Sequence, residues 1–466
     1  MTVIEGAAQQ GAAEGAPQLG KSLRPRHVTM ITIGGIIGAG LFVASSASIA
    51  TTGPAIIVSY GLAGLVMLIV MRMLGEMAIA FPQIGAFTEF AREGLGNWAG
   101  FTNGWLYWLN WAIIAAIEAL AGARIIHDWL PQFPVWVVGW ALLAVLTGVN
   151  LLSTRSYGEF EFWFASIKVA AIIAFIALAL AFVLGHAPLT QVSNLYVHGG
   201  FSPFGTAAVF SGVVSVIFAL CGAEIATIAA AESPDGARAV SRMTGTVTLR
   251  ILLFYVGSIS LILMIVPWNQ IHPGISPFTV ALQAMGFPAA VLGMKLIVLT
   301  AVLSCLNSSI YVTSRVLFTL SARGDAPKVL VKLDRRKVPA RAILFSSLAG
   351  YAAVYASMVS PERVFAFLVN AVGSIMLVIY LITALAHIRL RHRLEKTEPE
   401  RLTFKVWLFP WLSYATVAAM AGVLFAMLLI ADRREEVLSG VVCLAAALAA
   451  YAALRLGRDR KAAGLT

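Results

Sequence analysis

The stretch GGIIGAG, at residues 34–40, interrupts an otherwise apolar segment and decides how the chain is expected to fold. Each of its four glycines lowers helix propensity by about 1 kcal/mol relative to alanine, so the stretch is expected to unwind and expose backbone N–H and C=O groups. The half-helix that follows would direct the positive end of its dipole at an anion such as a carboxylate. The same glycines also fit close helix packing, because Gly34 and Gly38 form a GxxxG pattern. Both interpretations remain open at this point.

A second interruption, FALCGAE at residues 218–224, lies five predicted spans later and contains one glycine. Broken helices at this separation are typical of transporters built from two five-helix repeats of opposite orientation, with the breaks facing one another at the bilayer midplane. The sequence therefore predicts a 5+5 inverted repeat in which helices 1 and 6 are broken.

The composition supports a membrane protein. Hydrophobic residues make up 59% of the 466 positions and charged residues only 12%, against about 25% charged in ordinary soluble domains. Because helices satisfy their own backbone in lipid, we expect an all-α polytopic membrane protein. Twelve segments provide the roughly 20 apolar residues that one crossing needs. They are residues 28–50, 54–80, 98–126, 134–153, 160–184, 206–231, 243–266, 289–320, 341–359, 363–388, 405–430 and 436–456.

These spans divide the chain into five regions. Residues 1–27 are expected to form a disordered cytoplasmic N-terminal tail, 28–184 the first repeat, 206–388 the second repeat, 405–456 two additional helices, and 457–466 a cytoplasmic C-terminal tail.

The positive charge of the chain is an orientation signal. A net charge of +11 in a soluble protein would suggest nucleic acid as a partner. Here most of the 33 Lys and Arg residues fall in segments on one predicted side, above all in residues 323–341 and 389–405. The positive-inside rule then places both termini of this multi-pass membrane protein in the cytoplasm.

Three ionisable side chains lie well inside predicted spans, where a charge costs roughly 2.5 to 3.5 kcal/mol and therefore indicates function. Lys168 of helix 5 could exchange a proton with each side in turn, or extend to the inner headgroups. Glu118 of helix 3 could meet a substrate ammonium or carry a proton, or form an interhelical ion pair. Glu224 directly follows the second break, where it could fix unwound backbone or touch substrate.

Helices 6 and 8 offer weaker candidates. Phe218 could close over a bound substrate or simply pack in the core. Ser304, Asn307 and Ser308 form a polar patch that could face helix 1 and hold an ion or Lys168, or could hydrogen-bond between helices.

Other chemistry is not indicated. Cys221, Cys305 and Cys443 lie in apolar runs without metal or redox spacing, and we interpret them as small buried hydrophobes. The chain has no GxxxxGK loop, HExxH motif or nucleophile elbow, so we expect neither an enzyme nor an ATP-driven pump, and neither a cofactor nor a metal.

Several longer stretches carry a family resemblance. They are GGIIGAGLF, RMLGEMA, WLYWLNWAI, FWFASIKV, FALCGAEIATIAAAES, FYVGSISLILMIVPWN and SCLNSSIYVTSRVLFTLSARGDAP. From about residue 23 to residue 455 the chain resembles the bacterial amino acid transporter family of the amino acid/polyamine/organocation (APC) superfamily. Within it, AAAES, PWN, SCLNS and WLFPWLSY resemble the 4-aminobutyrate (GABA) permeases.

The resemblance implies a substrate site between the two breaks. By analogy, Ile36, Gly38, Ala39 and Gly40 would meet the substrate carboxylate, and Phe218, Ala219, Cys221 and Gly222 would meet its ammonium end with help from Glu118. Ala39 stands where many relatives have threonine, which bears on the choice of substrate.

The same resemblance implies coupling to protons. Lys168 matches the lysine that takes the sodium-site position in related proton-coupled members, contacting helices 1 and 8, and Glu118 is a second candidate proton carrier. Glu224, Ser304, Asn307 and Ser308 would support the site.

Together these features predict a proton-coupled symporter that imports a small amino acid, GABA first among them, by alternating access. Proline, aromatic and small D-amino acids are alternative substrates. A channel fits less well, because the chain has neither charge rings nor a repeated filter. A transporter-like sensor fits less well, because the tails are too short for a large soluble output domain. The expected partners are the amino acid, a proton and the lipid bilayer, without nucleic acid.

Overall fold

The computed structural model describes residues 30, 37–82, 87–152, 154–185, 188–225, 227–228, 251–358, 361–430 and 434–462. In this part of the chain every regular element is helical, and eight helices are long and apolar enough to cross a membrane. Three shorter apolar helices accompany them, Gly205–Leu220, Leu253–Ile265 and Ala340–Ala356. The prediction of an all-α polytopic membrane protein is confirmed at this level.

The first half of the chain contains η1 (Gly40–Ala44), α3 (Ser45–Thr52), η2 (Gly53–Ala55), α4 (Ile56–Ala80), α5 (Phe87–Leu95), α6 (Asn97–His127), α7 (Val135–Leu152) and α8 (Thr154–Gly185). The run Gly40–Ala80 has 41 residues, about 60 Å of helix, which is twice the hydrocarbon thickness of a bilayer. Gly53, whose φ is 69°, and Pro54 turn the chain between α3 and α4, as predicted for two separate segments.

The second half contains α9 (Pro188–Ser193), α10 (Gly205–Leu220), η3 (Ile251–Gly257), α13 (Ser258–Ile265), η4 (Trp268–Gln270), α14 (Pro277–Ala284), α15 (Pro288–Ala322), η5 (Lys328–Val331), α16 (Ala340–Ala356), α17 (Pro361–Thr397), η6 (Pro399–Arg401), α18 (Trp411–Leu429) and α19 (Arg434–Ala462). Within two predicted spans, 28–50 and 206–231, the helix is not continuous, since bends at Ile37 and Gly38 precede η1 and α10 ends at Leu220. Residues 28, 29, 31–36, 226 and 229–231 of these spans lie outside the described residues. Residues 243–250 of the predicted seventh span lie outside the described residues.

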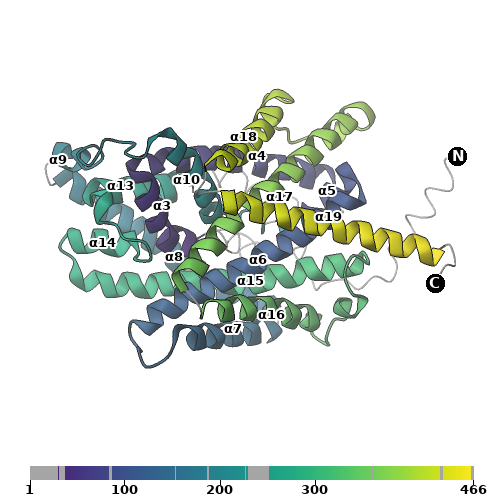
Figure 1. The fold of residues 1–466 in the computed structure, drawn as a ribbon, viewed down its shortest axis with the longest axis horizontal. Coiled ribbons are helices and arrows are strands. Elements are labelled where there is room, and N and C mark those ends of the chain that lie inside the picture. Colours follow the sequence, from purple (N-terminus) through teal and green to yellow (C-terminus); the bar gives the residue numbers. More distant parts are fainter. Residues whose placement is uncertain are drawn as a thin grey trace.

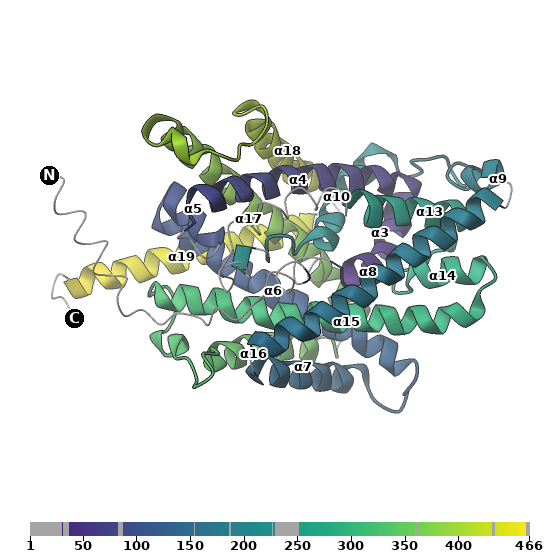
Figure 2. The same ribbon diagram turned by 180° about the vertical axis from the view of Figure 1, so that it is seen from behind.

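The long helices α6 and α15 form the centre of the molecule and lie side by side in both views (Figures 1 and 2). Helices α7 and α16 cover one flank, and α4, α10 and α17 pack on the other. The surrounding protein buries 72% of the most apolar 18-residue stretch of α6. It buries only 22% of the corresponding stretch of α18 and 11% of that of α19. The last two helices therefore lie at the periphery, where most of their surface faces lipid.

One end of the molecule gathers charged side chains. Arg92 of α5 pairs with Asp325 after α15 at 2.5 Å, and Arg323 pairs with Glu89 of α5 at 3.0 Å. Arg458 of α19 approaches the same Asp325 at 3.6 Å. These contacts bring α5, the segment after α15 and α19 together on the right in Figure 1. Basic segments that the sequence assigned to one side of the membrane thus lie at one end of the fold.

Candidate substrate site

The first break is an unwound stretch followed by a π-helical turn. Ile37 and Gly38 are bends, and η1 then runs from Gly40 to Ala44 before α3 begins. Such π-helical turns are frequent at functional sites. Ile36, assigned to the carboxylate subsite from sequence, lies outside the described residues.

Glycines in this break allow close packing as well as unwinding. A Cβ on Gly38 would lie 2.6 Å from Oε1 of Glu118, and a Cβ on Gly40 would lie 2.5 Å from the Cα of Ala219. Because backbone cannot yield as a flexible side chain can, Gly40 sets how closely the two broken helices approach each other. Close packing at Gly38 and Gly40 therefore occurs at the same break as the bends at Ile37 and Gly38, whereas Gly34 of the GxxxG pattern lies outside the described residues.

The second break follows α10. Cys221 is extended and Gly222 has a φ of 120°, a conformation that side-chain-bearing residues rarely adopt. The carboxylate of Glu224 accepts hydrogen bonds from the N–H of Gly222 at 3.2 Å, from Tyr107 Oη at 3.1 Å and from Tyr380 Oη at 3.0 Å. Glu224 is fully buried, and its contacts hold the unwound backbone.

Glu118 of α6 binds the first break. Both of its carboxylate oxygens accept the backbone N–H of Ala39, at 3.0 and 3.1 Å, and only 1% of the residue is exposed. An unpaired N–H at the start of a helix attracts an anion. In this conformation the carboxylate of Glu118 accepts the backbone N–H of Ala39, which the sequence analysis expected to bind the substrate carboxylate.

Lys168 of α8 binds the same break from the opposite side. Its Nζ donates to the carbonyl of Ile37 at 2.8 Å and to Ser304 Oγ of α15 at 2.9 Å, and the residue is fully buried. The Nζ atom lies 3.9 Å from Oε1 of Glu161, which also accepts a 2.6 Å hydrogen bond from Ser304. The lysine thus links the first break to α15, as the resemblance implies.

Glu161 was not singled out from the sequence. It precedes Lys168 by seven residues, which is two helical turns, so both side chains project from one face of α8. That spacing, together with the cost of burying a second charge, is a signal that could have identified the pair.

The three polar residues of α15 singled out from the sequence each bind a different side chain. Ser304 holds Lys168, whereas Asn307 accepts a hydrogen bond from Asn150 of α7 at 2.8 Å and Ser308 bonds Tyr157 of α8 at 3.1 Å. The last two contacts join helices, which was the structural alternative for this patch.

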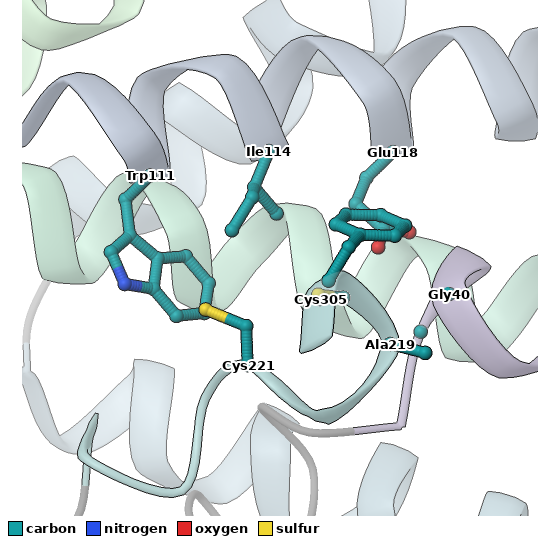
Figure 3. Close-up of a pocket in the computed structure, with 9 residues that line it drawn as sticks. Gly40, Trp111, Ile114, Glu118, Ala219, Cys221 and Cys305 are labelled. Carbon is teal, nitrogen blue, oxygen red and sulfur yellow. The ribbon is translucent and has the colours of Figure 1, made fainter. Parts of the chain in front are cut away.

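Between the two breaks lies a small cavity (Figure 3). Its lining consists of Gly38, Gly40, Trp111, Ile114, Glu118, Phe218, Ala219, Cys221 and Cys305. The space open to the centre of a water molecule is about 10 Å³, enough for one water molecule. In this conformation the surrounding side chains and backbone therefore leave no room for an amino acid between the two breaks.

Sequence reasoning named most of this lining but left out Trp111, Ile114 and Cys305 as site residues. Trp111 and Ile114 precede Glu118 by seven and four residues, and Figure 3 shows all three side chains projecting from one face of α6 toward Cys221 and Cys305. Helical spacing from Glu118 could have identified the first two. Ala39 and Gly222 contribute backbone to the breaks without lining the cavity.

A polytopic helical fold with a small cavity between two broken helices, lined mainly by apolar side chains and the carboxylate of Glu118, is typical of secondary transporters. The sequence matches the family described as "Amino acid permease" over residues 27–455, and the chain belongs to this family. It is 48% identical to the gamma-aminobutyric acid permease of Bacillus subtilis (strain 168), with 91% of each chain aligned. It is 44% identical to a probable GABA permease of Pseudomonas aeruginosa, covering 90% and 89% of the two chains.

The protein is thus a membrane transporter for amino acids and not an enzyme, as predicted. It is also 38% identical to the aromatic amino acid transport protein AroP of Corynebacterium glutamicum, over 90% of this chain and 92% of the relative. The family assignment made from sequence motifs is confirmed.

Proposed function

We propose that the protein is a proton-coupled symporter that imports 4-aminobutyrate across the bacterial inner membrane. Its substrate is supported by the names of the similar permeases from B. subtilis and P. aeruginosa. The further proposals are twelve spans, a 5+5 inverted repeat with helices 11 and 12 outside it, and both termini in the cytoplasm. The separation of two breaks by five predicted spans and the peripheral position of α18 and α19 support this layout.

The first break carries the functional argument, because it is held by a carboxylate on one side and an ammonium on the other. The N–H of Ala39 binds Glu118, and the carbonyl of Ile37 binds Lys168. A zwitterion brings the same two groups in one molecule. We propose that the substrate carboxylate takes the N–H of Ala39, with Gly38 and Gly40 beside it, and that the released Glu118 turns to the substrate ammonium.

The second break completes the proposed site. Phe218, Ala219 and Cys221 line the cavity opposite Glu118, with Gly222 in the adjoining backbone. A cavity of about 10 Å³ is smaller than any amino acid, so the breaks must separate before substrate enters. Separation exposes the site to one side of the membrane, and closure around the substrate precedes exposure to the other.

Proton coupling is assigned to Lys168 and Glu118, both of which contact the first break. A proton on Lys168 gives the ammonium that binds Ile37 and Ser304, and loss of that proton removes its charge from this contact. Substrate and proton can drive the cycle only if each binds one conformation more tightly than the other. The first break is the element whose conformation both ligands would bias.

Uptake of labelled GABA by proteoliposomes under an imposed pH gradient tests the function. We expect saturable accumulation that collapses with a protonophore. Uptake that is independent of the gradient would exclude proton coupling, and absence of GABA uptake with an intact melting transition would exclude the substrate.

Aromatic amino acids are the second candidate, supported by the similarity to AroP of C. glutamicum. Competition by unlabelled phenylalanine, proline and small D-amino acids against GABA separates these alternatives. Inhibition by phenylalanine at lower concentration than by GABA itself would assign the protein to aromatic transport.

A further inference from the structure

A second, much larger hollow lies on the lipid-facing flank, between α7, η5 and α16. Its volume is about 610 Å³. Ala144, Gly148 and Leu151 of α7 line one side, and Leu344 and Leu348 of α16 line the other. Figures 1 and 2 both show α7 and α16 side by side at the edge of the fold. The lining of this hollow shares no residue with that of the substrate cavity. We call this hollow the α7–α16 groove.

The α7–α16 groove is apolar and open. Leu344 and Leu348 are 52% and 64% exposed, and a Cβ placed on Gly148 would meet no atom within 4 Å. The hydroxyls of Thr147 and Ser347, which also line it, bond each other at 2.9 Å. Because these two polar groups satisfy each other, the groove presents a surface suited to hydrocarbon.

One end of the groove is positively charged. Among the described residues of the lining, Arg341 is the one ionised side chain, and it is exposed. Its Nη1 donates to the carbonyl of Val329 in η5 at 3.4 Å, which leaves further guanidinium donors for a ligand. Arg336 is held at the same end, since its Nη1 donates to the carbonyl of Leu152 at the end of α7 at 3.1 Å. Arginine is suited to binding phosphate through paired N–H donors.

The chain segment that contains Arg336 and Arg341 is rich in other cations. The segment 323–341 also contains Arg323, Lys328, Lys332, Arg335 and Lys337, against only Asp325 and Asp334. This segment belongs to the charged end of the fold, because Arg92 of α5 pairs with Asp325. Basic clusters between membrane helices at such an end attract anionic headgroups.

We propose that the α7–α16 groove binds one anionic phospholipid, with an acyl chain along Gly148, Leu344 and Leu348 and its phosphate at Arg341 and Arg336. A second copy of this chain fits the groove less well. A two-fold interface brings the same surface of both copies together, and the basic segments would then face each other. A zwitterionic lipid such as phosphatidylcholine offers the same phosphate but adds a quaternary ammonium, which the surrounding cations repel.

Native mass spectrometry of the full chain in detergent tests the proposal, with added phosphatidylglycerol or phosphatidylcholine of identical acyl chains. We expect phosphatidylglycerol to be retained in preference to phosphatidylcholine. Replacing Arg341→Gln should reduce the preference about fivefold, the effect of one cation near an anionic surface. Equal retention of both lipids by the unmodified protein would overturn the assignment.

Gly148→Leu places a branched side chain in the path proposed for the acyl chain and should abolish tight retention of either lipid. Gly422→Leu on the peripheral helix α18 is the matched control, because its Cβ also meets no atom within 4 Å. We expect both variants to keep the lipid-free melting temperature and GABA uptake, and only the first to lose the lipid. Retention of phosphatidylglycerol by Gly148→Leu would overturn the proposal.

Native mass spectrometry also distinguishes two other occupants of the groove, a phosphate compound without acyl chains and a second copy of the chain. Glycerol phosphate without acyl chains should not displace phosphatidylglycerol, and efficient displacement would show that the groove takes no chain. A lipid-free dimer that Gly148→Leu dissociates, while Gly422→Leu does not, would show that a second copy fills the groove.

Discussion

Each break interrupts a helix next to the substrate cavity, but the two breaks are held in different ways. The first break is bound by side chains from two other helices, a carboxylate of α6 on Ala39 and an ammonium of α8 on Ile37. The second break is held by Glu224, two residues beyond Gly222, whose carboxylate accepts hydrogen bonds from two tyrosines. A zwitterionic substrate can replace the partners of the first break, whereas those of the second are an internal network. We therefore expect the first break to move during transport and the second to stay in place as its support.

Removing the ammonium that binds the first break should have the largest effect on GABA accumulation. Lys168→Ala leaves the carbonyl of Ile37 and the carboxylate of Glu161 without this partner. We expect no accumulation of GABA above its external concentration under an imposed pH gradient, measured in proteoliposomes. Unchanged accumulation would return Lys168 to a structural role.

A control separates coupling from folding, because an unpaired buried charge alone destabilises a protein by about 3 to 5 kcal/mol. Adding Glu161→Gln to Lys168→Ala removes that charge while keeping the acceptor for Ser304. We expect the double variant to regain the melting temperature of the unmodified protein and still fail to accumulate GABA.

Neutralising the carboxylate of the first break should have the next largest effect. Glu118→Gln keeps an acceptor for the N–H of Ala39 but loses the charge proposed to meet the substrate ammonium. A hydrogen bond to a charged group contributes about 1.5 to 3 kcal/mol, so GABA should bind roughly tenfold to 100-fold more weakly. Binding is measured by scintillation proximity with labelled GABA.

Butyrate, which has the same carboxylate but no ammonium, provides the control ligand. In the unmodified protein it should compete far less well than GABA, and in Glu118→Gln the two should become similar. If the variant kept its preference for GABA over butyrate, Glu118 would not be the partner of the ammonium.

The same exchange in the second break should affect stability more than substrate. Glu224→Gln weakens the network with Tyr107, Tyr380 and Gly222. We expect a loss of about 1 to 3 kcal/mol in stability and little change in the affinity for GABA. Thermal melting in detergent and the binding assay above measure the two quantities. A large loss of affinity without a loss of stability would place Glu224 at the substrate.

The positions of the helices, the breaks and the buried charges can be predicted from the sequence, but the partners of those charges cannot. Hydropathy places the helices well, because each crossing needs a continuous apolar stretch, and the glycines locate both breaks. The cost of burying charge identifies Glu118, Lys168 and Glu224. The partner of each charge depends on how helices distant in sequence pack, so neither the contact of Glu118 with Ala39 nor the role of Glu161 was predicted. The resemblance to relatives, rather than spacing, connected Lys168 with helices 1 and 8.

The smallest effect should come from removing one hydroxyl from the second break. Tyr380→Phe deletes a single hydrogen bond to Glu224, worth about 1 kcal/mol, and leaves the ring in place. Tyr107→Phe removes the equivalent bond to the other oxygen of the carboxylate. If Glu224 acts as one buried unit, the double variant should lose more stability than the sum of the two single losses, because its carboxylate then lacks both hydroxyls. Additive losses in thermal melting would show that each tyrosine supports the second break independently.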